Sequence, residues 1–326
     1  MRKPELLAPA GDLEKLKIAI CNPRKLAAFL LCRIAPLMSD KLFLKWLFRL
    51  EMGYKLNLDN PQTFSEKLQW LKLYYRHPQL TTLVDKLEVK KIVAEIIGEE
   101  YVIPTLGSWS SVEEIEWDKL PNQFVLKTNH DGGNFGVVIC KDKKSFDRKK
   151  AMKRLNQSLH RSSYLLGREW PYKNVQRCIF AEQYIEDVSV GELVDYKFFC
   201  FDGVPQYLYV ASGRQNSKDL VKYDFYDMQF NHMEIIQPPH KNTDCQIEKP
   251  MCFEEMKPIL DKLAGILVNG VKIPHVRIDL YHVNGKIYFG EYTFFHCGGL
   301  ASLSPNKWNY IFGDYIILPE KVTENN

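Results

Sequence analysis

The hydrophobic pattern of the chain is helical near its start and becomes a mixture of helix and strand after about residue 84. Residues 24–56 are helical by pattern, and apolar residues recur at helical spacing over 41–50 with basic residues between them. These apolar positions are Leu42, Phe43, Trp46, Leu47 and Leu50. A helix of this kind is typical of a membrane surface and equally of a helix that packs on its own domain, and the pattern leaves both readings open.

The following segments predict an α/β (α+β) fold. Thr63 and Glu66 form a capping-box pattern at the start of a further helix. A helix over about 84–98 is predicted to end at Gly98, and a charged helix is predicted at 146–160. Strands are predicted at 124–130, 136–142, 178–185, 195–201 and 205–211, and a hairpin at 276–294. A helix precedes the hairpin, and residues 212–248 are polar and predict a mobile, loop-rich segment.

These elements divide the chain into three predicted segments. Residues 1–80 form a helical N-terminal region, residues 81–183 a central segment with the first strands, and residues 184–326 a C-terminal segment. The first twenty residues resemble the opening of the collagenase-like peptidase family, PELLAPAGDLEKL, but the strand motif that follows in that family is missing. We therefore give this leader no part in the function.

Composition and charge narrow the class of protein. The chain has 326 residues, of which 45% are hydrophobic and 26% charged, as in ordinary globular proteins. Its net charge of +4 is too small to indicate a nucleic-acid partner. The eight cysteines form no C-x-x-C pair, which favours a reducing compartment, and neither a secretory signal nor an uninterrupted membrane-length apolar run is evident. We expect a cytoplasmic protein.

The hairpin 276–294 carries the most informative polar residues. If its turn is the three residues 284–286, Asp279 lies opposite Glu291 and Arg277 opposite Thr293, so all four side chains share one face of the sheet. A two-residue turn would instead place the two carboxylates on opposite faces. Two carboxylates with oxygen-bearing neighbours suit Mg²⁺, although a solvated sheet face with an Arg–Asp pair would give the same pattern.

A glycine-rich segment follows the strand at 124–130. Lys127 is the sole charged residue among the apolar positions of this strand, and residues 131–136 contain Gly132, Gly133 and Gly136. Glycines let backbone N–H groups turn toward a polyphosphate, and a lysine beside them supplies a positive charge. The segment matches neither the Walker A pattern nor G-x-G-x-x-G, so an ordinary turn is the alternative.

A third group of polar residues lies at the ends of two predicted strands. One strand ends in Glu182 and Gln183, with Ile185 shortly after, and the next begins with Asp195. A carboxylate and an apolar residue at a strand end are suited to an adenine edge, and a second carboxylate to a ribose. Taken alone, the same residues form two strands joined by a charged loop.

These three pieces, in this order, resemble the ATP-grasp superfamily. Within it, the closest likeness is to the TupA-like branch, which is linked to teichuronopeptide and other cell-surface polymer biosynthesis. The likeness covers about residues 53–300 and is carried by NPQTFSEKLQWLKLYYRHP, LVDKLEVKKIV, GEEYVIP, LPNQFVLKTNH, GREWPYKN, DYKFFCFDGVPQYL and VRIDLYHVNGKIYFGEYTF. The resemblance implies an ATP-grasp fold, in which two β-layers clasp ATP beside a helical N-terminal region.

The resemblance also implies a role for each candidate residue. Lys86 and Lys127 would bind the ATP phosphates under a lid formed by residues 131–136. The adenine would lie against Glu182, Gln183 and Ile185, and the ribose against Asp195. Asp279, Glu291 and Thr293 would be the Mg²⁺ ligands, while Arg277, together with Lys127, would act on the transferred phosphoryl group. Thr293 departs from the family pattern, which reads Asn at this position, and FFHCGG (294–299) replaces a Pro-Gly loop.

The function implied is that of an ATP- and Mg²⁺-dependent carboxylate–amine ligase. A substrate carboxylate, on a small molecule or a glycan, would become an acyl phosphate that an amine then displaces. The alternatives are a glycosyltransferase of capsular or exopolysaccharide synthesis and a non-catalytic nucleotide-binding module. The first is disfavoured because the chain has no Asp-x-Asp, and the second because Lys86, Lys127, Asp279 and Glu291 are all present. The basic helix over 41–50 adds the hypothesis of peripheral association with the inner face of the plasma membrane.

Overall fold

The computed structural model describes residues 23–133, 135–187, 193–213, 220–244 and 247–322. The peptidase-like leader lies outside these residues. The α-helices are α2 (Pro23–Ile34), α3 (Asp40–Met52), α4 (Phe64–Tyr74), α5 (Gln79–Val84), α6 (Val89–Ile97), α7 (Arg148–Leu159), α8 (Ser163–Gly167), α9 (Phe253–Ala264) and α10 (Lys307–Asp314). Short 3-10 helices are η1 (Ala35–Leu37), η2 (Glu99–Tyr101), η3 (Trp170–Tyr172) and η4 (His296–Gly299).

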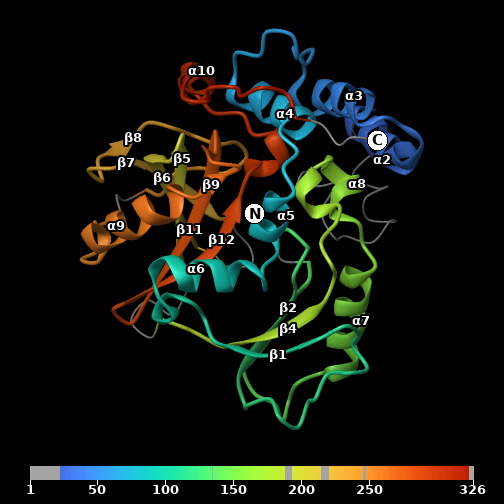
Figure 1. Ribbon diagram of the computed structural model, residues 1–326, viewed down its shortest axis with the longest axis vertical. Coiled ribbons are helices and arrows are strands. Elements are labelled where there is room, and N and C mark those ends of the chain that lie inside the picture. The colour runs from blue at the N-terminus through green and yellow to red at the C-terminus, as the bar shows by residue number, and fades with distance from the viewer. Residues whose placement is uncertain (1–22, 134, 188–192, 214–219, 245–246, 323–326) are drawn as a thin grey trace.

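Two antiparallel sheets organise the molecule (Figure 1). One has the order β1-β4-β2-β3, made of β1 (Thr105–Trp109), β2 (Phe124–Thr128), β3 (Val137–Cys140) and β4 (Ile179–Gln183). The larger has the order β12-β11-β5-β6-β7-β8, made of β5 (Val194–Phe201), β6 (Val204–Ser212), β7 (Lys222–Asp227), β8 (His232–Met233), β11 (His275–Val283) and β12 (Lys286–Thr293). A small hairpin joins β9 (Leu267–Val268) to β10 (Val271–Lys272). The two β-layers with a helical N-terminal region match the predicted architecture.

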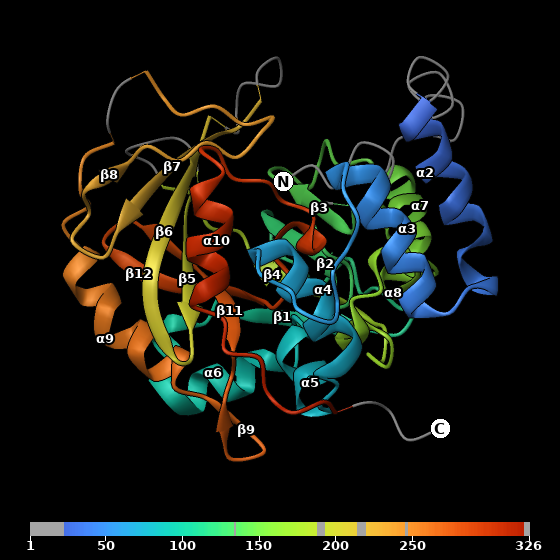
Figure 2. The same ribbon diagram turned by 90° about the horizontal axis from the view of Figure 1, so that it is seen from above.

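Each large sheet has its own hydrophobic core. The smaller sheet packs against α7 around Phe124, Leu126 and Leu155. The larger sheet shares one continuous core with α3, α4, α6, α9 and α10. Seen from above, α2 and α3 lie on the side of the molecule opposite α9 (Figure 2). The division of the chain at residues 80 and 183 stays a prediction.

Two predicted elements differ from the structure. The helix expected over 84–98 is interrupted, because the Asp85 carboxylate accepts hydrogen bonds from the backbone N–H groups of Leu87 and Glu88 and holds a turn there. The segment 212–248, predicted as loop, contains β7, which pairs with β6. The charged residues of this strand made it resemble a loop in the sequence. Asp224 is nevertheless buried, and two hydrogen bonds from Thr243, each of 3.0 Å, compensate for its lost hydration.

Helix α4 connects the N-terminal region to the end of the chain. The predicted capping box is confirmed: the Thr63 side chain accepts from the backbone of Glu66, and the Glu66 carboxylate accepts from the backbone of Thr63. On the buried face of the helix, Lys72 Nζ donates to the carbonyls of Gly167 at 2.7 Å and Gly298 at 2.6 Å. Gln69 Nε2 donates to the Gly299 carbonyl at 2.7 Å. The helix therefore fixes the loop that replaces the family's Pro-Gly segment.

Helix α3 is amphipathic but only partly covered. Phe43 and Leu47 are buried in the core, whereas Leu42 and Trp46 are about half exposed. The packing interpretation therefore accounts for one face of the predicted helix and leaves the other unexplained. None of the helices in the part of the chain that the structure describes is long and apolar enough to span a bilayer.

Buried histidines make the fold sensitive to acid. His275 lies on β11 among the rings of Phe64, Phe199 and Phe201, and burial lowers its pKa to about 3. The native state thus excludes a proton that the unfolded chain binds below its ordinary pKa of about 6.5. Above pH 6.5 the histidine is neutral in both states, and its contribution to the free energy of unfolding is fully present. As the pH falls toward 3, the unfolded chain binds the proton and the native state does not, so the free energy of unfolding falls.

We predict that the free energy of unfolding of the wild type falls steeply below pH 6.5 and that His275→Phe flattens the slope by about one proton, or about 1.4 kcal/mol per pH unit. Urea titrations at several pH values measure this slope. His160→Phe, at an exposed position, serves as the control and should leave the slope unchanged. Equal slopes in the wild type and His275→Phe would refute the assignment.

Candidate functional site

The hairpin of β11 and β12 places the two predicted metal ligands side by side. Asp279 pairs with Glu291, as predicted, and Arg277 with Thr293. The turn, however, has two residues, Asn284 and Gly285, both with positive φ, so the predicted three-residue turn is wrong.

A bulge restores the predicted alignment. The register shifts between Asp279 and Leu280, which leaves Gly290 as the extra residue on β12. A Cβ atom at this position would lie 3.0 Å from the Asp279 carbonyl oxygen and 3.0 Å from the Tyr281 ring. Glycine thus allows the bulge that returns both carboxylates to one face.

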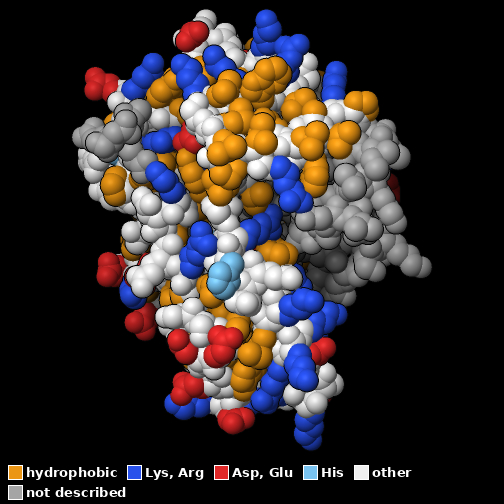
Figure 3. Space-filling view, turned by 90° about the vertical axis from the view of Figure 1, so that its right-hand side faces the viewer, with side chains coloured by type: hydrophobic (Ala, Val, Ile, Leu, Met, Phe, Trp, Pro, Cys, Tyr) orange, Lys and Arg blue, Asp and Glu red, His pale blue; other side chains and the backbone are white. Residues whose placement is uncertain are grey.

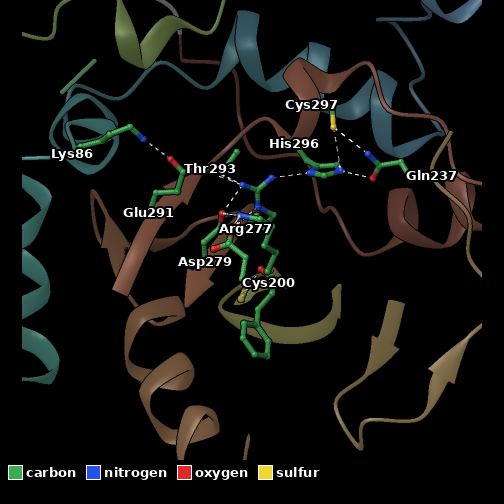
Figure 4. A network of polar contacts seen from close by, with 12 residues as sticks. Lys86, Cys200, Gln237, Arg277, Asp279, Glu291, Thr293, His296 and Cys297 are labelled. Atoms are coloured by element: carbon green, nitrogen blue, oxygen red, sulfur yellow. Dashed lines mark hydrogen bonds and ion pairs between the residues drawn. The ribbon is translucent and has the colours of Figure 1, made fainter. Parts of the chain in front are cut away.

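The Arg277 guanidinium lies at the centre of the site (Figure 4). Its side chain is 1% exposed and forms a bidentate pair with Asp279, at 2.6 Å from Nε and 2.8 Å from Nη2. The same Nη2 atom donates to Thr293 Oγ1 at 3.0 Å and lies 3.4 Å from Glu291. Four residues of the hairpin therefore share one charge-assisted network.

Burial and neighbouring charges shift the pKa values of this network in opposite directions. Burial by itself would raise the pKa of Glu291, but Lys86, Lys197 and Arg277 hold it well below its ordinary value. Burial likewise disfavours the charge of Arg277, and Asp279 outweighs it, so the pKa of the guanidinium is raised. Both groups are therefore ionised over the whole physiological pH range.

Lys197 belongs to the site although sequence analysis did not select it. It lies on β5 directly beside Asp279 in the sheet register, and its Nζ forms an ion pair with the Asp279 carboxylate. It also lies 3.1 Å from Asp195, the predicted ribose ligand, which is buried. The signal was present in the sequence as a lone lysine in an apolar strand, two residues after Asp195.

Lys86, which precedes α6, contacts this network through Glu291. Its Nζ forms an ion pair with Glu291, while its backbone N–H donates to the Asn129 carbonyl at 3.0 Å. The Asn129 side chain in turn donates to Asp85 at 2.8 Å. Lys86 is thus anchored at the end of β2 in the smaller sheet, while its side chain reaches a carboxylate of the larger one.

Lys127 lies in a separate group on the smaller sheet. Its Nζ forms an ion pair with Glu182 on the adjacent β4, and Lys90, which was not predicted, contacts the other oxygen of the same carboxylate at 2.5 Å. Burial would raise the pKa of Glu182, but the two lysines hold it below its ordinary value. Lys86 and Lys127 therefore neutralise different carboxylates.

The glycine-rich segment is described except for residue 134. Asp131 anchors its start, because its carboxylate accepts from Ser158 Oγ at 3.0 Å and Ser163 Oγ at 3.2 Å. Gly136 has a packing role, since a Cβ atom there would lie 2.0 Å from Thr128 Oγ1. Gly132 and Gly133 are more accessible, and Gly133 has a φ of 77°.

The predicted adenine-binding residues lie at the end of β4. Gln183 is exposed and Ile185 is half-buried. The turn of the β11–β12 hairpin reaches this segment, because Asn284 donates from its backbone to Asp187 at 3.1 Å and from its side chain to the Glu186 carbonyl at 3.1 Å. The two sheets therefore meet beside the predicted adenine hinge.

The donor set fits Mg²⁺ held jointly with phosphates. Within the described ranges, no three His, Cys, Asp or Glu residues gather as a metal cluster, so the protein alone does not form a cage. Mg²⁺ usually binds one or two carboxylates together with substrate phosphates. The Glu291 side chain is 29% exposed and accessible to such a ligand, whereas Asp279 is 1% exposed and already surrounded by donors.

Comparison with known proteins identifies the family. The family described as TupA-like ATP-grasp matches residues 66–317. No curated protein sequence matches this chain.

Solved structures resemble the chain at low identity. The D-alanine–D-alanine ligase from Bacillus anthracis complexed with ATP is 17% identical, with a TM-score of 0.37 over 67% of this chain and 56% of the ligase. The D-alanine–D-alanine ligase from Coxiella burnetii is 12% identical, with a TM-score of 0.39 over 77% of this chain and 63% of the ligase. The chain thus covers less than two thirds of the length of either structure.

The matched segment contains every predicted site residue, from Lys86 to Thr293. The match confirms the ATP-grasp prediction. It gives the glycosyltransferase alternative no support. The chain belongs to the TupA-like ATP-grasp family.

Proposed function

We propose that this protein joins a carboxylate to an amine through an acyl phosphate, using ATP. The observation that carries the proposal is the network around Arg277, in which Asp279 and Glu291 lie on one face of the hairpin within reach of Lys86. Clustered cations stabilise the charge that develops during phosphoryl transfer, and paired carboxylates serve the metal that accompanies the nucleotide.

Lys86 and Lys127 are proposed to bind the phosphates of ATP. Each lysine forms an ion pair with a carboxylate, Lys86 with Glu291 and Lys127 with Glu182. The phosphates of ATP carry more negative charge than one carboxylate and would compete for the same lysines. Residues 131–136 are proposed as the lid, because accessible Gly132 and Gly133 follow the anchored Asp131. Gln183, Ile185 and Asp195 complete the proposed nucleotide site.

Glu291, with Thr293 beside it, is proposed to hold Mg²⁺, and Asp279 would join it by exchanging its ion pair with Lys197 for the metal. When bound, the metal would neutralise phosphate charge and act as a Lewis acid. Arg277 orients both carboxylates, since it donates hydrogen bonds to each and to Thr293.

The proposed reaction has two steps. A carboxylate oxygen of the substrate attacks the γ-phosphorus, the bond to the β,γ-bridging oxygen breaks, and ADP leaves. The amine nitrogen then attacks the acyl carbon, the bond to the phosphate oxygen breaks, and the amine loses a proton as phosphate departs. We place this reaction in the modification of a cell-surface polysaccharide or peptidoglycan-like polymer, on the strength of the resemblance to the TupA-like branch.

We predict that Lys127→Ala weakens ATP binding about tenfold, because it removes a charge-assisted contact worth about 1.5–3 kcal/mol. Glu291→Gln should leave ATP binding within a few-fold of wild type but slow ADP release about 100-fold, since it removes charge where phosphoryl transfer takes place. Equilibrium titration with ATP and a coupled ADP assay measure the two effects. Lys149→Ala, at an exposed position on α7, is the matched control.

Trapping with hydroxylamine tests the intermediate. An acyl phosphate gives a hydroxamate, so the wild type supplied with ATP and a panel of amino acids and uronic acids should form one, and Glu291→Gln should not. ADP release that never depends on an added carboxylate would rule out the ligase proposal.

We further propose that α2 and α3 rest on an anionic membrane surface. Five apolar side chains on these two helices and on η1 between them are 47–88% exposed: Leu30, Ile34, Leu37, Leu42 and Trp46. Exposed basic residues lie among them on the same helices, including Arg33, Lys41, Lys45 and Arg49. The face of the molecule that carries these helices shows hydrophobic side chains gathered in its upper half, with Lys and Arg beside them (Figure 3). Apolar contacts with adjacent basic charge fit a bilayer of acidic lipids.

Cosedimentation with vesicles tests this surface. The wild type should bind phosphatidylglycerol vesicles better than phosphatidylcholine vesicles, and the double variant Leu37→Glu, Trp46→Glu should bind about tenfold less. Met251→Glu changes an apolar residue that is even more exposed, before α9 on the opposite side of the molecule, and should bind as the wild type does. Equal binding by all three proteins, or none to either vesicle, would exclude the membrane proposal.

A further inference from the structure

A cavity of about 720 Å³ lies next to the site and has no part in nucleotide binding as proposed above. Its walls come from the end of α3, the start of α4, residues 237–240, residues 297–302 and the start of α10. It therefore lies between the N-terminal helical region and the C-terminal loops. Its volume suits a small molecule of sugar or amino-acid size.

A chain of hydrogen bonds connects this cavity to Arg277. The guanidinium lies 3.0 Å from His296 Nδ1, and His296 Nε2 lies 2.7 Å from Gln237 Oε1. Gln237 Nε2 in turn donates to Cys297 Sγ at 3.3 Å. Gln237 and Cys297 both line the cavity, so its inner wall is two hydrogen bonds from the proposed phosphoryl-transfer site (Figure 4).

The charge of the cavity wall is negative. Among the described residues that line it there is no lysine or arginine, and the two charged groups are the carboxylates of Glu51 and Glu66. Glu66 is fully occupied by the cap of α4, where it accepts from the backbone of Asn57, Gln62 and Thr63. Glu51 has no hydrogen-bond donor within the part of the chain that the structure describes. Burial raises the pKa of Glu51, and the charge of Lys25 opposes this shift.

The remaining lining includes no further aspartate or glutamate. It combines two tyrosines with amide side chains, namely Tyr54, Tyr310, Asn57, Gln62, Asn306 and Asn309. Aromatic faces and amides are suited to a hydroxyl-rich ligand, because they offer apolar contact together with neutral donors and acceptors. Among the described lining residues, a carboxylate or phosphate ligand would find no lysine or arginine.

We infer that this cavity binds the amine substrate, as an ammonium group on a hydroxylated scaffold such as an amino sugar, with Glu51 as its counter-charge. The inference rests on the proposed ligase function and names the class of its nucleophile. Binding draws the cation into the cavity by charge complementarity, and the carboxylate substrate is excluded by the same charge.

The side chains at the inner wall of the cavity do not compete with the amine as nucleophiles. Cys297 lies there, but burial raises the pKa of its thiol to about 11, so the sulfur stays protonated and does not attack an acyl phosphate. His296 is kept neutral, because burial and Arg277 lower its pKa well below the ordinary value. These neutral groups leave the bound amine, once its ammonium group has given one proton to water, as the available nucleophile on this side.

Calorimetric titration without ATP tests the inference. Glucosamine is the cationic probe, and glucose and glucuronate are its neutral and anionic counterparts. Glucosamine should bind the wild type more tightly than either, and Glu51→Gln should weaken its binding about tenfold by removing one charge-assisted hydrogen bond. Asp59→Asn removes an exposed carboxylate outside the cavity and should leave the affinity unchanged. Thermal unfolding checks that Glu51→Gln is folded.

Equal affinity of glucosamine for the wild type and Glu51→Gln, no binding of glucosamine, or preference for glucuronate would each overturn the inference. Because the titration contains no nucleotide, its outcome is separate from that of the ligase proposal. Hydroxamate formation with Glu51-independent glucosamine binding would refute the amine site alone. Glu51-dependent binding without any carboxylate-dependent ADP release would leave the site and refute the ligase.

Discussion

The buried charge of Arg277 is the constraint around which the larger sheet is arranged. A guanidinium inside a protein must be paired and hydrogen-bonded, because losing its hydration is costly. Here the partners come from its own strand, from β12 and from the loop that begins at His296. Removing one partner would leave an uncompensated charge in the core, so the hairpin, the bulge and the loop are held to one arrangement.

The same requirement extends to the N-terminal region through α4. Lys72 is a second buried cation, and its donors are satisfied by main-chain carbonyls of residues that lie far apart in the sequence. One of these, Gly298, belongs to the loop that presents His296 to Arg277. The helical region thus holds the loop on which both the Arg277 network and the neighbouring cavity depend. It is therefore a structural part of the site.

Much of the fold and the central carboxylate pair followed from local patterns. Strand alternation and the capping box are encoded by neighbouring residues, which is why they were predictable. The pairing of Asp279 with Glu291 was predicted from a wrong turn length, and it held because Gly290 supplies a bulge that periodicity cannot reveal.

Lys197 and Lys90 were missed for a different reason. The segment shows Lys197 as a lone lysine in an apolar strand, but it does not show the partners of either lysine, which lie on distant strands. Likewise, Glu51 is unremarkable as one charge at the end of a helix. It becomes significant only when the C-terminal loops enclose it.

The position of Asn129 has a mechanical consequence. Its main-chain carbonyl accepts from Lys86, and its side chain is hydrogen-bonded to Asp85 and to the backbone at Cys178. Lys86 is therefore hydrogen-bonded to the end of β2, while α6, which follows it, packs in the core of the larger sheet. Its ion-pair partner, Glu291, lies on β12 of the larger sheet. A hinge displacement between the sheets would therefore act on the segment 85–88, where the hydrogen bonds to Asn129 meet the ion pair with Glu291.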